Sequence, residues 1–178
     1  MQWQIDPSHS SVSAKVKHMM LTTVRGSFSG VTGVIDFDPA HPEAGGVELR
    51  IPAASVNTGD EKRDGHLRSA DFLDAATHPE IVFKSTKVTP KGRDEFVVDG
   101  DLTIRGVTKP VAVGVELLGI AADPRAGKRA GFDAKLSFDR TRWGLTWNMP
   151  VPSGVLVSEK VTIEANIAAT PRAEAAAA

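Results

Sequence analysis

Residues 96–117 read FVVDGDLTIRGVTKPVAVGVEL, and their apolar side chains recur at every second position. Phe96, Val98 and Leu102 share one parity before the turn, and Val111 and Val113 begin a second alternating run after it. A period of two is typical of a strand that buries one face, since successive side chains of a strand point to opposite sides. The stretch therefore predicts two neighbouring antiparallel strands.

The same alternation extends over most of the chain. Six further runs show it, separated by Gly, Pro, Asp and Asn, at residues 12–18, 24–37, 47–53, 81–83, 130–138 and 161–167. In the long run 24–37 the apolar phase slips around Gly30, which predicts a bulge. Eight strands joined mainly by short turns favour an extended up-and-down antiparallel barrel, because closure removes the exposed sheet edges. A two-sheet sandwich is the alternative.

One segment departs from the strand pattern, and it lies near residues 59–73. Thr58 and Glu61 have the spacing of a capping box, which predicts a short helix starting at Gly59. Leu67, Phe72 and Leu73 give this helix an apolar side that would close one end of a barrel.

Composition limits the classes of function. Among 178 residues, 21 Lys and Arg balance 22 Asp and Glu, so the net charge is -1 and no basic stripe predicts a nucleic-acid partner. There is no cysteine, which removes disulfides, thiolate catalysis and cysteine-ligated metals. We expect a single domain over residues 1–170, a low-complexity tail over 171–178, and no metal site.

The sequence also bears on membranes and location. No stretch approaches the roughly 20 apolar residues of a spanning helix, so we expect no stable membrane insertion. The opening MQWQIDPSHS has neither a basic nor an apolar leader segment, from which we expect a cytoplasmic protein.

The residues that face inward are often small. Ala14, Gly26, Ala134 and Ala165 alternate with Val and Ile, which leaves room in a barrel of eight strands for one apolar ligand. A filled core with a few voids is the competing interpretation.

Five polar residues are candidates for contacting a ligand's head group. His18 ends the first run on its apolar face, and Arg25 follows across a short turn. Arg63 and His66 share a helix face, where Asp64 is placed to orient one of them. The alternatives are a histidine bonded to a backbone carbonyl, a solvated arginine at a strand end, and a solvated helix face.

Motifs of catalysis are missing from the sequence. There is no GxSxG elbow, HExxH pair or phosphate loop, so we expect no enzyme activity and no catalytic residue. An enzyme acting on a lipophilic substrate with His18 or His66 as acid or base is one alternative, and an interaction protein with a filled barrel is another.

The motifs together resemble the YceI-like family of lipocalin-like polyisoprenoid-binding proteins. The resemblance rests on WQIDPSHSSVSAKVKHM (3–19), VRGSFSGVTGVIDFD (24–38), TGDEKRDGHLRSADFLD (58–74), HPEIVFKST (78–86), GDLTIRGVTKPV (100–111), FDRTRWGL (138–145) and VSEKVTIEANI (157–167). It implies a lipocalin-like barrel that binds, stores or transports an isoprenoid quinone or polyprenyl phosphate without a cofactor, and it allows a homodimer.

The resemblance also implies where the ligand lies. His18 and Arg25 fall in the family's HM…RG stretch, and Arg63, Asp64 and His66 in its RD-HL stretch, so these residues are expected to flank the head group. Relatives often have other residues where this chain has Asp139, Arg142 and Trp143, which would alter the polarity of the mouth. The lumen is expected to be lined by Val12, Ala14, Val16, Phe28, Leu67, Phe72, Phe83, Leu102, Ile104, Leu117, Phe132, Leu136, Phe138 and Trp143.

Overall fold

The main sheet of the computed structural model, which describes residues 1–172, curls into a closed barrel. Around the ring follow β1 (Gln2–Ile5), β4 (Thr32–Asp36), β5 (Gly46–Pro52), β6 (Glu80–Pro90), β7 (Glu95–Ile104), β8 (Val107–Asp123), β9 (Gly127–Asp139) and β12 (Lys160–Pro171). Each strand pairs antiparallel with the next, and β12 pairs back onto β1. The predicted eight-stranded antiparallel barrel is therefore confirmed.

Two further strands extend this ring at one end. β2 (Ser11–His18) follows β1 after a short 3-10 turn (Pro7–His9) and pairs with β12, whereas β3 (Thr22–Phe28) pairs with β2. β1 with β2, and β3 with β4, are thus two halves of interrupted barrel strands. The predicted continuous strand over 24–37 is corrected, because it breaks at residues 29–31, where Gly30 takes a left-handed φ of 69°.

β1 was not among the predicted strands, although it completes the ring. It is four residues long, and its alternating Trp3 and Ile5 are each only 2% exposed. The Trp3 indole N–H donates to the carbonyl of Phe37 at 3.2 Å, so the buried ring keeps its hydrogen bond. Two apolar residues are too few to reveal a period of two.

β4 and β5 approach each other closely at Gly33. A Cβ at this position would lie 2.1 Å from the carbonyl oxygen of Glu48, and Gly33 has a φ of 155°. Only glycine fits there without moving the backbone, so this contact fixes how the two strands meet.

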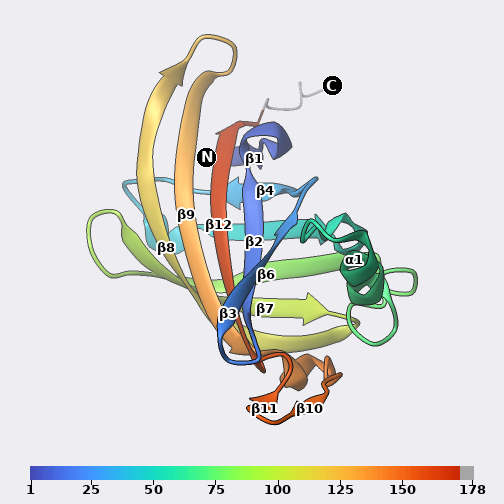
Figure 1. Ribbon diagram of the computed structural model, residues 1–178. Coiled ribbons are helices and arrows are strands. Elements are labelled where there is room, and N and C mark those ends of the chain that lie inside the picture. The colour runs from blue at the N-terminus through green and yellow to red at the C-terminus, as the bar shows by residue number, and fades with distance from the viewer. Residues whose placement is uncertain (173–178) are drawn as a thin grey trace.

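The two ends of the barrel carry different extensions. β8 and β9 continue past the ring as a hairpin arm, which is at the top of Figure 1. A register shift between Leu117 and Gly119 marks where the arm leaves the wall. At the bottom of the view lies the small hairpin of β10 (Pro150–Val151) and β11 (Gly154–Val155).

The predicted helical segment contains one helix, α1 (Glu61–Arg68), followed by turns. Its cap corrects the prediction, since Asp60 and not Thr58 accepts the N–H of Arg63, at 3.0 Å. The Thr58 hydroxyl donates instead to Asp64, at 2.6 Å. Asp60 caps more directly because it precedes the first helical residue. The remaining short elements are 3-10 turns at Pro42–Ala44, Ala53–Ser55 and Arg140–Trp143.

An ion cluster holds the hairpin arm against the start of the chain. The Arg129 guanidinium donates to Asp6 at 2.7 Å and to Asp123 at 2.8 Å. Hydrogen bonds from the Ser8 hydroxyl and from Arg129 hold the pKa of Asp6 well below its usual range. Backbone N–H groups of Ala126 and Arg125, together with Arg129, lower the pKa of Asp123 to about 2.

Replacing Arg129 with methionine is therefore expected to lower the melting temperature by several degrees at neutral pH. Both carboxylates have a lower pKa in the folded chain than in the unfolded one, so their stabilising effect is present above the usual value of 3.8 and decreases as the pH falls below it, toward about 2 for Asp123 and lower still for Asp6. Thermal unfolding followed by circular dichroism should show that the difference from wild type shrinks over that range.

Arg125 offers the matched control, because only its backbone N–H contacts Asp123. Arg125→Met should leave the melting temperature unchanged at every pH. A deficit in Arg129→Met that is equally large at neutral pH and at pH 2 contradicts the assignment of the effect to these carboxylates.

Candidate functional site

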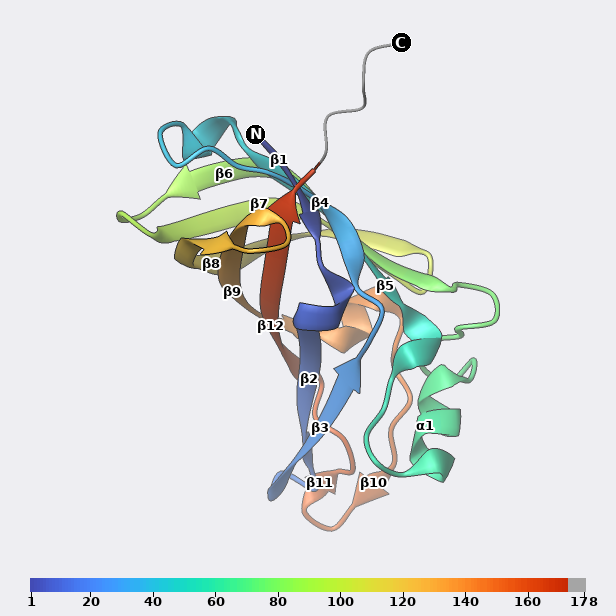
Figure 2. The same cartoon turned by 90° about the horizontal axis from the view of Figure 1, so that it is seen from above.

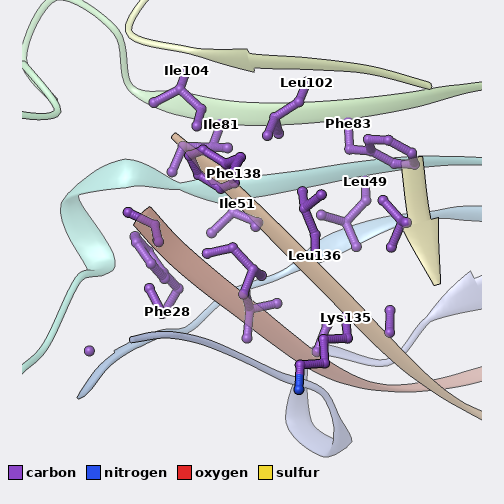
Figure 3. Close-up of a pocket in the computed structure, with 18 of the residues that line it drawn as sticks. Phe28, Leu49, Ile51, Ile81, Phe83, Leu102, Ile104, Lys135, Leu136 and Phe138 are labelled. Atoms are coloured by element: carbon purple, nitrogen blue, oxygen red, sulfur yellow. The ribbon is translucent and has the colours of Figure 1, made fainter. Parts of the chain in front are cut away.

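The barrel encloses one large apolar cavity of about 920 Å³. This lies toward the upper end of the roughly 300–1,000 Å³ found for small-molecule sites. Figure 3 shows side chains of β5, β6, β7 and β9 around the same space, among them Leu49, Phe83 and Leu136. The barrel is therefore hollow, which argues against the alternative of a filled core.

Small residues on adjacent strands create this space. Ala165 of β12 lies directly opposite Ala134 of β9, and Ala14 of β2 lies opposite Gly26 of β3. All four line the cavity. Because each contributes at most a methyl group, the facing walls do not meet at the centre of the barrel.

The cavity has an aromatic wall near β1 and β4. Phe37, which follows β4, packs edge-on against Phe96 and Phe132, with ring centroids 5.8 and 5.5 Å apart. All three rings line the cavity and are nearly fully buried. This cluster lies at the end of the ring opposite the β2–β3 turn.

The predicted lumen positions all line the cavity except Leu117 and Trp143. Leu117 is partly buried against the core, opposite Phe132 and just before the register shift, but it is not part of the cavity lining. Trp143 is fully buried in the turn after β9, where it packs edge-on against Phe138 and donates to the carbonyl of Leu102 at 2.9 Å. The Trp143 ring therefore supports the wall from behind. The structure thus corrects the predicted lumen positions of Leu117 and Trp143.

Polar side chains gather at the end of the cavity formed by the β2–β3 turn and α1. His18 and Thr22 reach it from the two strands, and Arg63 and His66 reach it from the helix. The structure thus brings three of the predicted head-group residues to one mouth. Lys17, Lys62, Thr58 and Asp60 line the same region.

Arg63 and His66 are each held by a neighbour. The Arg63 guanidinium donates to the hydroxyl and to the carbonyl of Thr58, at 2.7 and 3.0 Å. His66 Nε2 lies 2.8 Å from Asp71, and its ring packs edge-on against Phe72 and Trp147. The Arg63 guanidinium and the His66 ring are therefore oriented before any ligand arrives.

Asp64 and Arg25 do not reach the cavity. Asp64 is 3% exposed and accepts hydrogen bonds from the hydroxyl and the N–H of Thr58. These bonds, of which the one from the hydroxyl has the larger effect, lower the pKa of Asp64, whereas burial raises it. It fastens α1 to the preceding loop. Arg25 lies on the outer face of β3, because its neighbours Val24 and Gly26 take the inward positions. The structure thus removes Asp64 and Arg25 from the group of residues predicted at the mouth.

Arg140 is the buried charge that sequence reasoning did not single out. It is 3% exposed and lines the cavity from the turn after β9. Burial lowers its pKa, partly offset by the nearby charges of Glu159 and Asp139. Its guanidinium donates to four backbone carbonyls, those of Ser158 (3.0 Å), Leu145 (2.6 Å), Trp147 (3.0 Å) and Val157 (3.3 Å).

Two kinds of feature are absent from residues 1–172. None of the helices there is long and apolar enough to cross a bilayer. In the same part of the chain, His, Asp and Glu side chains nowhere form a group of three arranged to hold a metal ion.

An eight-stranded antiparallel barrel around one apolar cavity is the architecture of barrels that hold a small ligand. Within this class, the chain belongs to the YceI-like family, whose domain model matches residues 3–169. It is 36% identical to a UPF0312 protein of Vibrio cholerae over 78% of this chain and 73% of that protein. It is 43% identical to protein YceI of Escherichia coli over 71% of this chain and 66% of that protein, or about two thirds of the relative's length.

Solved structures agree with this assignment. The crystal structure of BcnA from Burkholderia cenocepacia has a TM-score of 0.81 and 28% sequence identity, and the match covers 93% of this chain and 99% of that one. A polyisoprenoid binding domain from Saccharophagus degradans matches with a TM-score of 0.71 over 96% of this chain and 98% of that one. At 17% identity, this second likeness concerns the fold alone.

Proposed function

We propose that the protein binds a long-chain isoprenoid lipid, such as an isoprenoid quinone or a polyprenyl phosphate, and stores or transports it without chemical change. The observation that carries the proposal is the apolar cavity of about 920 Å³, whose polar side chains gather mainly at the end near α1, with Asp36 and Lys135 elsewhere in the lining. An apolar tail with a polar head has the same asymmetry. Burial of each methylene contributes up to ~0.8 kcal/mol, so a long chain binds tightly without many polar contacts.

The head group of such a lipid lies at the mouth in this proposal. Arg63 and His18 supply donors for a phosphate oxygen or a quinone carbonyl, and His66 completes the group from α1. The tail then extends past Ala134 and Ala165 toward Phe37. The Saccharophagus degradans domain, which shares the fold, is described as polyisoprenoid-binding, and this description supports the choice of ligand class.

His66 is placed to act as a fixed donor to a head group. His66 Nε2 lies against Asp71, and the His66 ring is packed by Phe72 and Trp147, an arrangement that fixes a donor in place. An enzyme with His18 or His66 as acid or base would turn over a lipophilic substrate, and alanine at the essential histidine would abolish turnover while sparing affinity.

Protein purified from its native source is expected to release an isoprenoid lipid on extraction with organic solvent, identified by mass spectrometry. Added menaquinone should also quench the fluorescence of Trp147, which lines the mouth. Trp147→Phe is the control for the optical signal, because the variant keeps an aromatic ring but loses this reporter. Repeated extracts without any long-chain lipid, combined with no uptake of added quinone, would overturn the proposal.

A further inference from the structure

Large apolar side chains are exposed around the mouth of the cavity. Met20 and Leu21 in the β2–β3 turn are 57% and 74% exposed, and Met149 and Val155, just before and at the end of the β10–β11 hairpin, are 51% and 36% exposed. We call these four residues the mouth lip. Of the other large hydrophobics that are exposed in the described chain, Leu118 and Ile120 lie on the hairpin arm and Met1 at the terminus.

The two halves of the lip are joined through the backbone, although they are far apart in sequence. The Met19 N–H donates to the carbonyl of Leu156 at 2.8 Å, and His18 forms a bridge with Val157. Figures 1 and 2 both show the β2–β3 turn, where β3 begins, beside the β10–β11 hairpin. The two segments are therefore held in a fixed relation.

The conformation of the β2–β3 turn is unusual for its residues. Met19 and Met20 have left-handed φ angles of 52° and 58°, which favour glycine or asparagine. Exposed turns normally carry such polar or small residues, whereas this one carries Met19, Met20 and Leu21 in succession. Neither packing in the core nor turn geometry explains why apolar side chains occupy this turn.

The lip borders the cavity and several basic side chains. His18, Thr22 and Val157, which adjoin the lip residues in sequence, line the cavity. Lys17, Lys62 and Arg63 line the same end together with Asp60, and α1 also carries Glu61 and Asp64, of which Asp64 is bonded to Thr58. An apolar lip with basic neighbours matches the interface of an anionic bilayer, where apolar side chains enter the acyl boundary and cations contact the head groups.

We propose that the mouth lip docks on the surface of an anionic lipid bilayer, so that lipid passes between membrane and cavity without crossing water. This inference rests on the proposed function, since a lipid cargo gives the docking its purpose. Four separate side chains are too few for the ~800 Å² per partner of a stable protein interface. A bilayer needs no complementary shape, which suits flexible Met and Leu side chains.

Flotation with phospholipid vesicles tests the docking. Wild-type protein should bind vesicles of phosphatidylcholine with phosphatidylglycerol more tightly than vesicles of phosphatidylcholine alone, and salt should weaken the binding. The double variant Met20→Ser with Leu21→Ser should bind at least tenfold more weakly. Leu118→Ser with Ile120→Ser is the matched control on the arm, and it should bind like wild type.

Uptake of menaquinone from dilute ethanol solution, measured in parallel, separates the two proposals. Normal uptake with no vesicle binding by wild type, or equal binding by the lip variant, overturns the docking proposal and leaves the proposed function standing. Vesicle binding that depends on the lip, without any quinone uptake and with solvent extracts that contain no long-chain lipid, supports the docking surface and overturns the proposed function. If the lip variant instead changes only the molecular mass in solution, the lip is an interface between two copies of the chain.

Discussion

Replacing Arg140 by methionine is expected to lower the free energy of unfolding by about 3–5 kcal/mol, the range for breaking a buried charged network. Methionine fills much of the same volume but donates no hydrogen bond. The carbonyls of Leu145, Trp147 and Val157 would lose the donor that Arg140 supplies. Arg140 is only 3% exposed, so water does not readily replace this donor. Each buried polar group without a partner costs about 1–3 kcal/mol.

The position of Arg140 explains why one residue has so large an effect. Its guanidinium connects the turn after β9 with residues 145–147 on one side and residues 157–158 on the other. These segments flank the β10–β11 hairpin and contribute Trp147 and Val157 to the mouth. We therefore expect Arg140→Met to weaken lipid retention as well as stability, because the mouth loses its anchor.

Chemical denaturation followed by tryptophan fluorescence measures the change. Arg142→Met is the matched control, because Arg142 is exposed and its main contact is with the Trp143 ring at 5.4 Å, worth under about 1 kcal/mol. The free energy of unfolding of Arg140→Lys should lie between those of Arg140→Met and Arg142→Met, since an ammonium group keeps the charge but cannot reach all of these carbonyls. Equal stability of the Arg140 and Arg142 variants would contradict the anchoring role.

The alternation of side chains predicted the wall of the barrel well. Every apolar run lies in strands, although the run 24–37 is divided between β3 and β4, because burial of one face on a sheet leaves a period of two that local sequence records. The short strand β1 was missed, since Trp3 and Ile5 alone cannot establish a period. Ring closure by β1 and β12 depends on contacts between the two ends of the chain, which no local pattern contains.

The cavity mouth was predicted in part. His18, Arg63 and His66 are at the mouth because strand and helix periods place them there. Arg25 faces outward. It was predicted at the mouth because it lies close to His18 in the chain, although the inward positions of Val24 and Gly26 already place Arg25 on the outer face. The role of Arg140 could not be found from sequence, because its partners are carbonyls, which every residue has.

Filling the cavity is expected to abolish lipid binding while leaving the barrel intact. Ala134 and Ala165 lie directly opposite each other on β9 and β12, and both face the lumen. Phenylalanine at both positions places two rings where the lipid tail passes in the proposed function. Titration with menaquinone, followed by quenching of Trp147, should show at least a hundredfold weaker binding, about 2.7 kcal/mol.

The stability of the filled barrel distinguishes occlusion from unfolding. Rings entering empty apolar space gain burial, so the double variant should unfold within about 1–3 kcal/mol of wild type even if some side chains must shift. Ala112→Phe is the matched control, because Ala112 lies on the outer face of β8, exposed, between the partly buried Val111 and Val113. It makes the same chemical change and should leave quinone affinity unaltered.

The outcome also reports on how the cavity is used. Ala165→Phe alone blocks the tail only if the lipid extends past the middle of the lumen, so a strong effect of the single variant indicates a tail that reaches toward Phe37, which lines the cavity wall near β4. Weak effects of both single variants with a strong effect of the pair indicate a tail that moves aside for one ring. Unchanged affinity in the folded double variant would mean that the ligand binds outside the lumen, because two added rings and a long apolar chain cannot share the same space.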